Sequence, residues 1–207
     1  MTEHPILFTP ENAWKVFTGD KTMTRRIVKP QPDTIVDGEP YWSVGGFRLR
    51  ASATNPLRCP YGTVGDRLWV RETHYRHGRW VKREEGKRGR YFQGNAHLPM
   101  FPEEMAECAE EGSTRKQEQQ QDRWWKRSAL FMPRWASRTT VEITAICMQP
   151  LHRITQLESL HEGCEGPDYT ANFFRLWESI HGPASRPKNE WVWCLSFRRI
   201  DDASQSL

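Results

Sequence analysis

The stretch Trp191–Ile200, which reads WVWCLSFRRI, decides the fold. Up to Phe197 every second residue is large and apolar, and in an extended chain such residues share one face. The alternation therefore predicts a long strand with one buried face. Two other segments have similar sequence features. Thr139–Ile146 alternates between apolar and polar residues in the same way, and Arg67–Thr73 follows a Gly-Asp turn. Both segments predict further strands.

The N-terminal part predicts a strand, a helix and a second strand. Pro5–Phe8 is a short apolar run. Thr9 is a typical helix N-cap because Pro10 follows at the first helical position, and Gly19 is the expected end of the helix. A strand is expected at Ile27–Val28, before the next proline.

The remaining segments predict loops and short helices. Residues 30–66 are rich in proline and glycine, which predicts loops with short extended pieces. Thr155 and Glu158 form a capping box that opens a short helix, and apolar residues at helical spacing predict another helix over 170–180. Strands, long insertions and a few short helices together indicate a small mixed α+β barrel, one domain over residues 1–207.

Composition excludes several classes of protein. The chain has 207 residues, 37% of them hydrophobic, and a formal net charge of +4. No apolar run approaches the roughly 20 residues that a membrane span needs, and the start Met1–Pro5 lacks a secretory signal, so we expect a cytoplasmic protein without membrane contact. The five cysteines are widely spaced without a CxxC pair, which favours isolated thiols. The histidines show no metal-ligand spacing and no glycine-rich phosphate loop is present, so neither metal nor cofactor is expected.

The segment Lys21–Arg26 combines three cations with two hydroxyls. It has two interpretations: a solvated basic turn, or the rim of a functional pocket. In an extended chain Thr22, Thr24 and Arg26 share one face, which the long Lys21 side chain can reach. A threonine hydroxyl becomes a nucleophile only when a base takes its proton, and a desolvated lysine can do so.

A second group of candidates lies in a basic and aromatic region, about residues 75–130. Residues 76–90 predict a hairpin, Pro102–Glu111 an acidic helix, and the polar run Ser113–Gln121 a mobile loop. Cations beside exposed rings suit single-stranded nucleic acid, although the tryptophans here also suit a core. The candidate nucleic-acid contacts are Arg79, Lys82, Arg83, Trp124, Trp125, Arg134 and Trp135.

Three separated motifs resemble the ASCH domain family of the PUA-like superfamily. They are Trp14–Arg26, Gly65–Glu72 and Trp191–Phe197, and Met132–Arg138 is further similar to a subgroup found in phages and prophages. The resemblance implies a small PUA-like β-barrel with short flanking helices and a cleft beside the first helix. It leaves the long basic insertion, about residues 75–130, uncovered.

The same resemblance implies a function. PUA-like proteins commonly bind RNA or modified bases, so we expect binding of RNA, of another single-stranded nucleic acid or of a modified nucleoside. One ASCH branch removes the acetyl group of N4-acetylcytidine. The corresponding roles here would be Lys21 as base, Thr24 as nucleophile and Glu162 as acid or base, with Thr22, Arg25 and Arg26 holding the substrate. Ribonuclease action, known in some relatives, is a second alternative.

Overall fold

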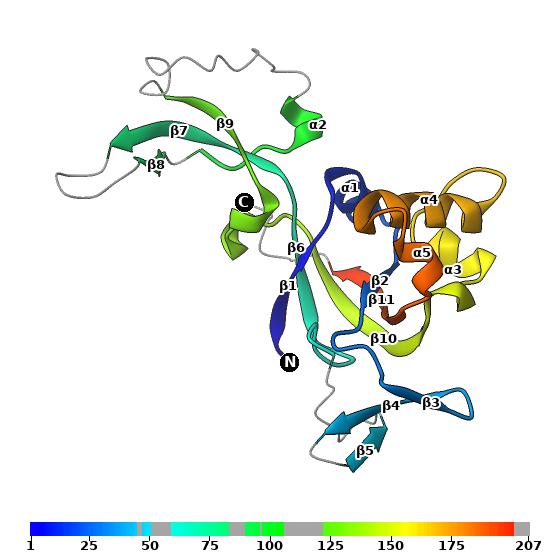
Figure 1. Cartoon of the computed structure of the whole chain (residues 1–207). Helices are drawn as coiled ribbons and strands as arrows, with labels where there is room; N and C mark the ends of the chain where they lie inside the picture. The colour runs from blue at the N-terminus through cyan, green and yellow to red at the C-terminus, as the bar shows by residue number, and fades with distance from the viewer. Residues whose placement is uncertain (45–46, 51–58, 83–89, 96, 106–121, 201–207) are drawn as a thin grey trace. The chain divides into compact units, whose positions relative to one another are not determined.

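The strands predicted over Trp191–Ile200, Thr139–Ile146 and Arg67–Thr73 belong to one five-stranded sheet of order β1-β6-β10-β11-β2 (Figure 1). The computed structural model describes residues 1–44, 47–50, 59–82, 90–95, 97–105 and 122–200. The strands of this sheet are β1 (Glu3–Leu7), β2 (Met23–Ile27), β6 (Arg67–Arg71), β10 (Thr140–Pro150) and β11 (Trp191–Ile200).

Long antiparallel pairing holds the middle of this sheet together. β10 pairs with β11 from Thr140 opposite Ile200 to Pro150 opposite Trp191, with one register shift near Ile143. β2 pairs with the other edge of β11, where Thr24 lies opposite Leu195. The strand expected at Ile27–Val28 therefore starts earlier, at Met23, and takes in most of the basic segment.

β11 is buried on both faces, which corrects the expectation of one buried face. Every residue from Trp191 to Leu195 is at most 8% exposed. On one face Val192 and Cys194 pack into a cluster with Phe173, Phe174 and Trp177 of α4 (Tyr169–His181). The other face packs against a second cluster, formed by Val28, Trp42, Trp191 and Trp193. Two covering layers exclude water from both sides of the strand.

The segment 30–66 contains more regular structure than its proline and glycine content predicts. Its extended pieces pair as a small sheet of order β3-β4-β5, with β3 (Thr34–Val36), β4 (Glu39–Val44) and β5 (Phe47–Arg50). Trp42 of β4 is 2% exposed, and its indole nitrogen donates to the carbonyl oxygen of Pro30 at 3.0 Å. Burial of this ring holds the small sheet against the second cluster.

The helices begin where their caps predict. In α1 (Pro10–Thr18) the Thr9 hydroxyl accepts from the Asn12 amide at 3.4 Å, and Gly19 follows with a φ of 90°. The capping box between Thr155 and Glu158 is present at the start of α3. The helices between β10 and β11 in the chain are η4 (Leu151–Arg153), α3 (Gln156–His161), α4 (Tyr169–His181) and α5 (Ser185–Lys188). None of the described helices is long and apolar enough to cross a membrane.

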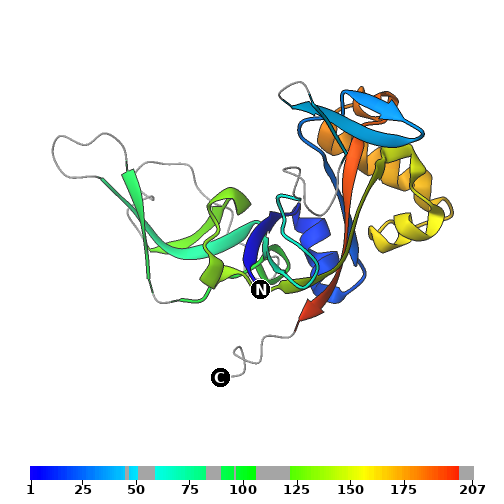
Figure 2. The same ribbon diagram turned by 90° about the horizontal axis from the view of Figure 1, so that it is seen from below.

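The chain divides into two compact units. Unit 1 holds residues 1–4, 14–69 and those from Thr139 onward, and unit 2 holds residues 5–13 and 70–138. Unit 2 contains a third sheet, of order β8-β7-β9, as Figure 2 also shows. Its elements are β7 (His74–Lys82), β8 (Arg90–Gly94), α2 (Pro102–Met105), β9 (Arg123–Arg127), η2 (Ala129–Phe131) and η3 (Arg134–Ala136).

The hairpin predicted over 76–90 is confirmed by the antiparallel pairing of β7 with β8. β9 pairs with the other edge of β7, and the sequence did not predict this strand. Of the helix predicted over Pro102–Glu111 the described part is α2, and Ser113–Gln121 lies outside the described residues. The α+β class is confirmed, while within the described ranges no pairing of β1 with β2 closes the five-stranded sheet into a barrel.

Candidate functional site

Lys21 and Glu162 form a buried ion pair in unit 1. Lys21 Nζ lies 2.5 Å from Glu162 Oε2 and also donates to the Glu162 carbonyl oxygen at 2.7 Å. The exposed fractions of the two side chains are 2% and 5%. The basic segment is therefore not a solvated turn at this position, which excludes the simpler of its two interpretations.

Backbone contacts at the end of α3 explain how residues so far apart in sequence meet. Gly163 ends the helix with a φ of 80°, and a Cβ there would lie 3.1 Å from Lys15 Cδ and 3.2 Å from Lys21 Cβ. Glycine is thus required for both its conformation and the close approach. Lys15 Nζ donates to the Gly163 carbonyl at 2.8 Å, and the Thr22 amide donates to the His161 carbonyl at 2.9 Å. These bonds dock the end of α3 onto the start of β2.

Arg25 completes the cluster from the same strand. Its guanidinium lies 3.1 Å from Glu162 Oε1 and 3.1 Å from Glu158 Oε2, and its side chain has no exposed surface. The guanidinium also lies 5.6 Å from the ring centroid of Phe173 in α4. Arg25, predicted to hold substrate, is therefore enclosed by α3 and α4 and orients both carboxylates.

Burial also controls the protonation of Lys21. Desolvation lowers the pKa of the Lys21 ammonium below 10.5, and the charge of Glu162 only partly opposes this shift. A lysine with a lowered pKa beside a carboxylate can pass its proton to that carboxylate and become a base. The pair therefore has the electrostatic properties of a proton-transfer site.

The two predicted threonines occupy different surroundings. Thr24 is 4% exposed on β2, next to Arg25 in sequence, so its side chain leaves the strand on the opposite face. In the part of the chain that the structure describes, no hydrogen bond joins Thr24 to Lys21. The backbone carbonyl oxygen of Thr22 accepts a hydrogen bond from the Phe197 amide at 2.9 Å. The structure thus unites Lys21 with Glu162 but leaves Thr24 outside that hydrogen-bonded pair.

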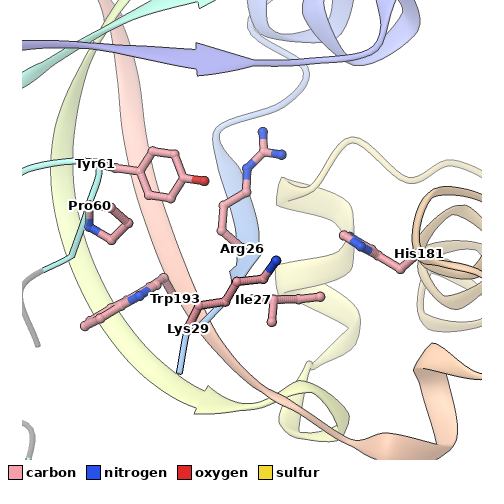
Figure 3. A pocket seen from close by; sticks show the side chains of 7 residues that line it. All are labelled: Arg26, Ile27, Lys29, Pro60, Tyr61, His181 and Trp193. Carbon is pink, nitrogen blue, oxygen red and sulfur yellow. The ribbon is translucent and has the colours of Figure 1, made fainter. Parts of the chain in front are cut away.

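A pocket of about 410 Å³ lies next to this cluster (Figure 3). Pockets for small ligands typically have volumes of about 300–1,000 Å³. Arg26 and Trp193 contribute side chains from β2 and β11, and the Tyr61 hydroxyl points toward Arg26. The lining residues are Arg26, Ile27, Lys29, Pro60, Tyr61, His181 and Trp193.

The pocket combines positive charge with aromatic surface. Burial lowers the pKa of the Arg26 guanidinium, while Tyr61 and Glu162 oppose the shift. Arginine side chains remain protonated in proteins. Burial, with Arg26 and Lys29, lowers the pKa of His181, which favours the neutral imidazole, and a neutral imidazole can accept a hydrogen bond.

The candidate nucleic-acid residues of unit 2 lie on two faces of its sheet. Arg79 lies 3.9 Å from Asp122, and Trp124 packs against His77 at a ring-centroid distance of 5.3 Å. Trp125 lies on the other face, opposite Arg76. Trp135 on η3 is 57% exposed. Arg134 starts η3, Lys82 ends β7, and Arg83 lies outside the described residues.

Of the seven lining residues of the pocket, sequence reasoning singled out Arg26 and missed the other six. The polar and aromatic ones among the six, Lys29, Tyr61, His181 and Trp193, come from four different segments, and no spacing rule links them. It also missed that Cys147 lies directly opposite Cys194 across β10 and β11. Strand register, which the alternation in both segments leaves open, decides this contact.

The described residues contain no group of three His, Cys, Asp or Glu side chains that could hold a metal ion. The candidate site consists of the buried ion pair of Lys21 and Glu162 and of the cationic, aromatic pocket that Arg26 lines. The chain matches no protein-family model, no curated protein and no solved structure.

Proposed function

We propose that this protein binds a nucleobase, carried on a nucleotide or a nucleic acid, in the pocket lined by Arg26. The observation that carries the proposal is that one pocket holds two cations and two aromatic rings. Arg26 and Lys29 suit the phosphate, because a guanidinium pairs with two phosphate oxygens at once. Tyr61 and Trp193 offer ring surface for the base.

The resemblance to the ASCH family supports the same proposal. Its three motifs fall on α1–β2, on β6 and on β11, and these strands belong to one sheet. We propose that this sheet is the core of a PUA-like barrel and that the protein is an ASCH protein of the phage type. The pocket then corresponds to the base-binding cleft that the resemblance implies.

Nucleotide titration tests the binding function. Cytidine 5′-monophosphate is titrated into the protein, and binding is followed by tryptophan fluorescence and calorimetry. We expect Arg26→Gln to weaken binding at least about tenfold, because a charge-assisted phosphate contact is lost. Arg153→Gln is the matched control, since Arg153 is an exposed arginine of unit 1 outside the pocket. Equal affinity of wild type and Arg26→Gln would refute the proposal.

A second candidate function is removal of an acyl group from N4-acylated cytosine. The specific observation in its favour is the buried Lys21–Glu162 pair, with the lowered pKa of Lys21. Neutral Lys21 would take the Thr24 hydroxyl proton while Thr24 Oγ1 attacks the acyl carbon. Glu162 would give a proton to the departing amine, and water would then hydrolyse the acyl-threonine ester and restore the hydroxyl.

Ultraviolet spectroscopy of N4-acetylcytidine tests this second function. We expect conversion to cytidine by the wild type and by Thr24→Ser, which keeps a hydroxyl, and none by Thr24→Val. Thr18→Val, at the exposed end of α1, is the control for loss of a hydroxyl outside the site. Full activity of Thr24→Val, or no conversion by the wild type, would exclude this mechanism.

A further inference from the structure

One face of the sheet β8-β7-β9 carries alternating arginines and aromatic rings. Side chains two apart on a strand share a face, so Arg76 and Trp80 of β7 lie on the same side of the sheet. The strand registers place Trp125 opposite Arg76 and Phe92 opposite Trp80. Arg123 and Arg127 of β9 are each two residues from Trp125 and lie on the same face of the sheet, which we call the arginine–aromatic face.

The arginines of this face stack on its rings. The Arg127 guanidinium lies 4.9 Å from the Trp80 centroid and 4.8 Å from that of Phe92. Arg76 lies 5.4 Å from the Phe92 centroid and 4.9 Å from the centroid of Trp135, which is 57% exposed. A guanidinium stacked on a ring has its position fixed but keeps N–H groups at its edge for another partner.

The backbone of β8 leaves room for one of these stacks. A Cβ at Gly94 would collide with the Arg76 guanidinium, whereas one at Gly78 would collide first with the backbone carbonyl oxygen of Gln93. The Trp125 indole nitrogen donates to the Gly78 carbonyl at 2.7 Å. Gly94 therefore lets the Arg76 side chain lie across the sheet, and Gly78 lets β7 and β8 approach each other closely.

Among the residues that the structure describes, no carboxylate forms an ion pair with Arg76 or Arg127. Burial and the charge of Arg76 together lower the pKa of Arg127. On the opposite face of the same sheet, by contrast, Arg79 lies 3.9 Å from Asp122. Two stacked cations that no described carboxylate pairs with are complementary to an anionic ligand.

We infer that the arginine–aromatic face binds single-stranded nucleic acid, with phosphates on Arg76 and Arg127 and bases stacked on Trp135 and its neighbouring rings. Cations alone would suit any polyanion, but rings beside them suit a partner whose bases are unpaired and free to stack. The inference deepens the proposed function by naming a polymer that carries the base. Only the link between this polymer and the base in the pocket rests on the proposed function, because the residues of the arginine–aromatic face all belong to unit 2.

Oligonucleotide binding with paired variants tests the inference. Anisotropy of labelled twelve-residue oligo(U) and oligo(dT) is measured over a series of salt concentrations. We expect Arg76→Gln with Arg127→Gln to weaken binding at least about tenfold. The slope of log affinity against log salt should flatten by about 1.4, since each lost phosphate contact contributes about 0.7 for a single strand. Lys126→Gln with Arg153→Gln removes the same charge from exposed positions outside this face and should leave binding unchanged.

The Trp135→Ala variant removes a stacking ring and leaves the arginines of the face in place. Because the Trp135 side chain is exposed, its removal should leave the protein folded. We expect about tenfold weaker binding with an unchanged salt slope. Equal losses in the two double variants, or binding of polyglutamate as tight as that of the oligonucleotides, would overturn the inference. Unchanged cytidine 5′-monophosphate binding in Arg26→Gln, with the expected oligonucleotide results, would refute the pocket proposal and leave this inference intact. Weakened cytidine 5′-monophosphate binding in Arg26→Gln, with oligonucleotide binding that Arg76→Gln with Arg127→Gln does not weaken, would refute the inference and leave the pocket proposal standing.

Discussion

At the scale of single residues, the cluster around Glu162 takes several charges out of water. Lys21 and Arg25 supply two cations, and Glu158 and Glu162 supply two carboxylates. Charges taken out of water are tolerated only when each is paired and hydrogen-bonded. Removal of one member leaves its partner charged and buried.

We expect Glu162→Gln to lower the free energy of unfolding by about 3–5 kcal/mol, because Lys21 and Arg25 lose their shared carboxylate. Glu165→Gln is the matched control. Glu165 lies 3.0 Å from Lys15 but its side chain is 80% exposed, so its loss should cost about 0–1 kcal/mol. Urea unfolding followed by circular dichroism measures both variants. Similar losses of unfolding free energy in the two variants would contradict the expected contribution of the buried cluster to stability.

At the scale of elements, the register of β10 and β11 decides the chemistry of two cysteines. Cys147 lies opposite Cys194, and the Cys147 side chain is exposed while that of Cys194 is buried. A hydrogen bond from the Cys194 thiol lowers the pKa of Cys147 to about 7. Burial and the same bond raise the pKa of Cys194. Adjacent thiols on one sheet therefore differ in reactivity.

Iodoacetamide labelling mapped by mass spectrometry tests this difference. The thiolate is the reactive form, so the labelling rate of Cys147 should rise with pH through about 7 and then level off. Cys194→Ala removes the hydrogen bond and should move this midpoint up toward 9.0. Cys164, which is buried, should remain unlabelled in the folded protein. A midpoint that does not move in Cys194→Ala would contradict the assigned cause.

At the scale of the whole molecule, the aromatic residues divide into two classes. Some fill cores, as Trp177 does at 4% exposure among the aromatic residues of α4. Others form surfaces, as Trp135 does at 57% exposure in unit 2. Composition does not separate the classes, because all ten tryptophans are chemically identical.

We expect Trp177→Ala to cost about 3–5 kcal/mol of unfolding free energy, because the cavity it leaves is enclosed by other side chains. Trp135→Ala should change stability by no more than about 0.5 kcal/mol. Urea titration of the two variants gives both values. A large loss in Trp135→Ala would mean that this ring belongs to a core.

Local patterns were enough to predict several elements of this fold. The strand at Trp191–Ile200, the capping box of α3 and the cap at Thr9 are all confirmed, because each depends on neighbours in sequence, whereas the single buried face predicted for that strand is wrong. The α+β class follows from the same elements. The strand at β9 was missed because its residues, Arg123–Arg127, suit a surface loop equally well until β7 pairs with them.

The sequence by itself determined which residue types are available at the candidate site, namely Lys21, Thr24, Arg26 and Glu162. Only the tertiary structure decided which of them meet. Glu162 reaches Lys21 because Gly163 lets the end of α3 approach the start of β2, and the alternation of β2 then sends Arg25 and Arg26 to opposite faces. Such contacts join segments far apart in the chain, and their geometry depends on the packing of whole elements, which no local pattern specifies.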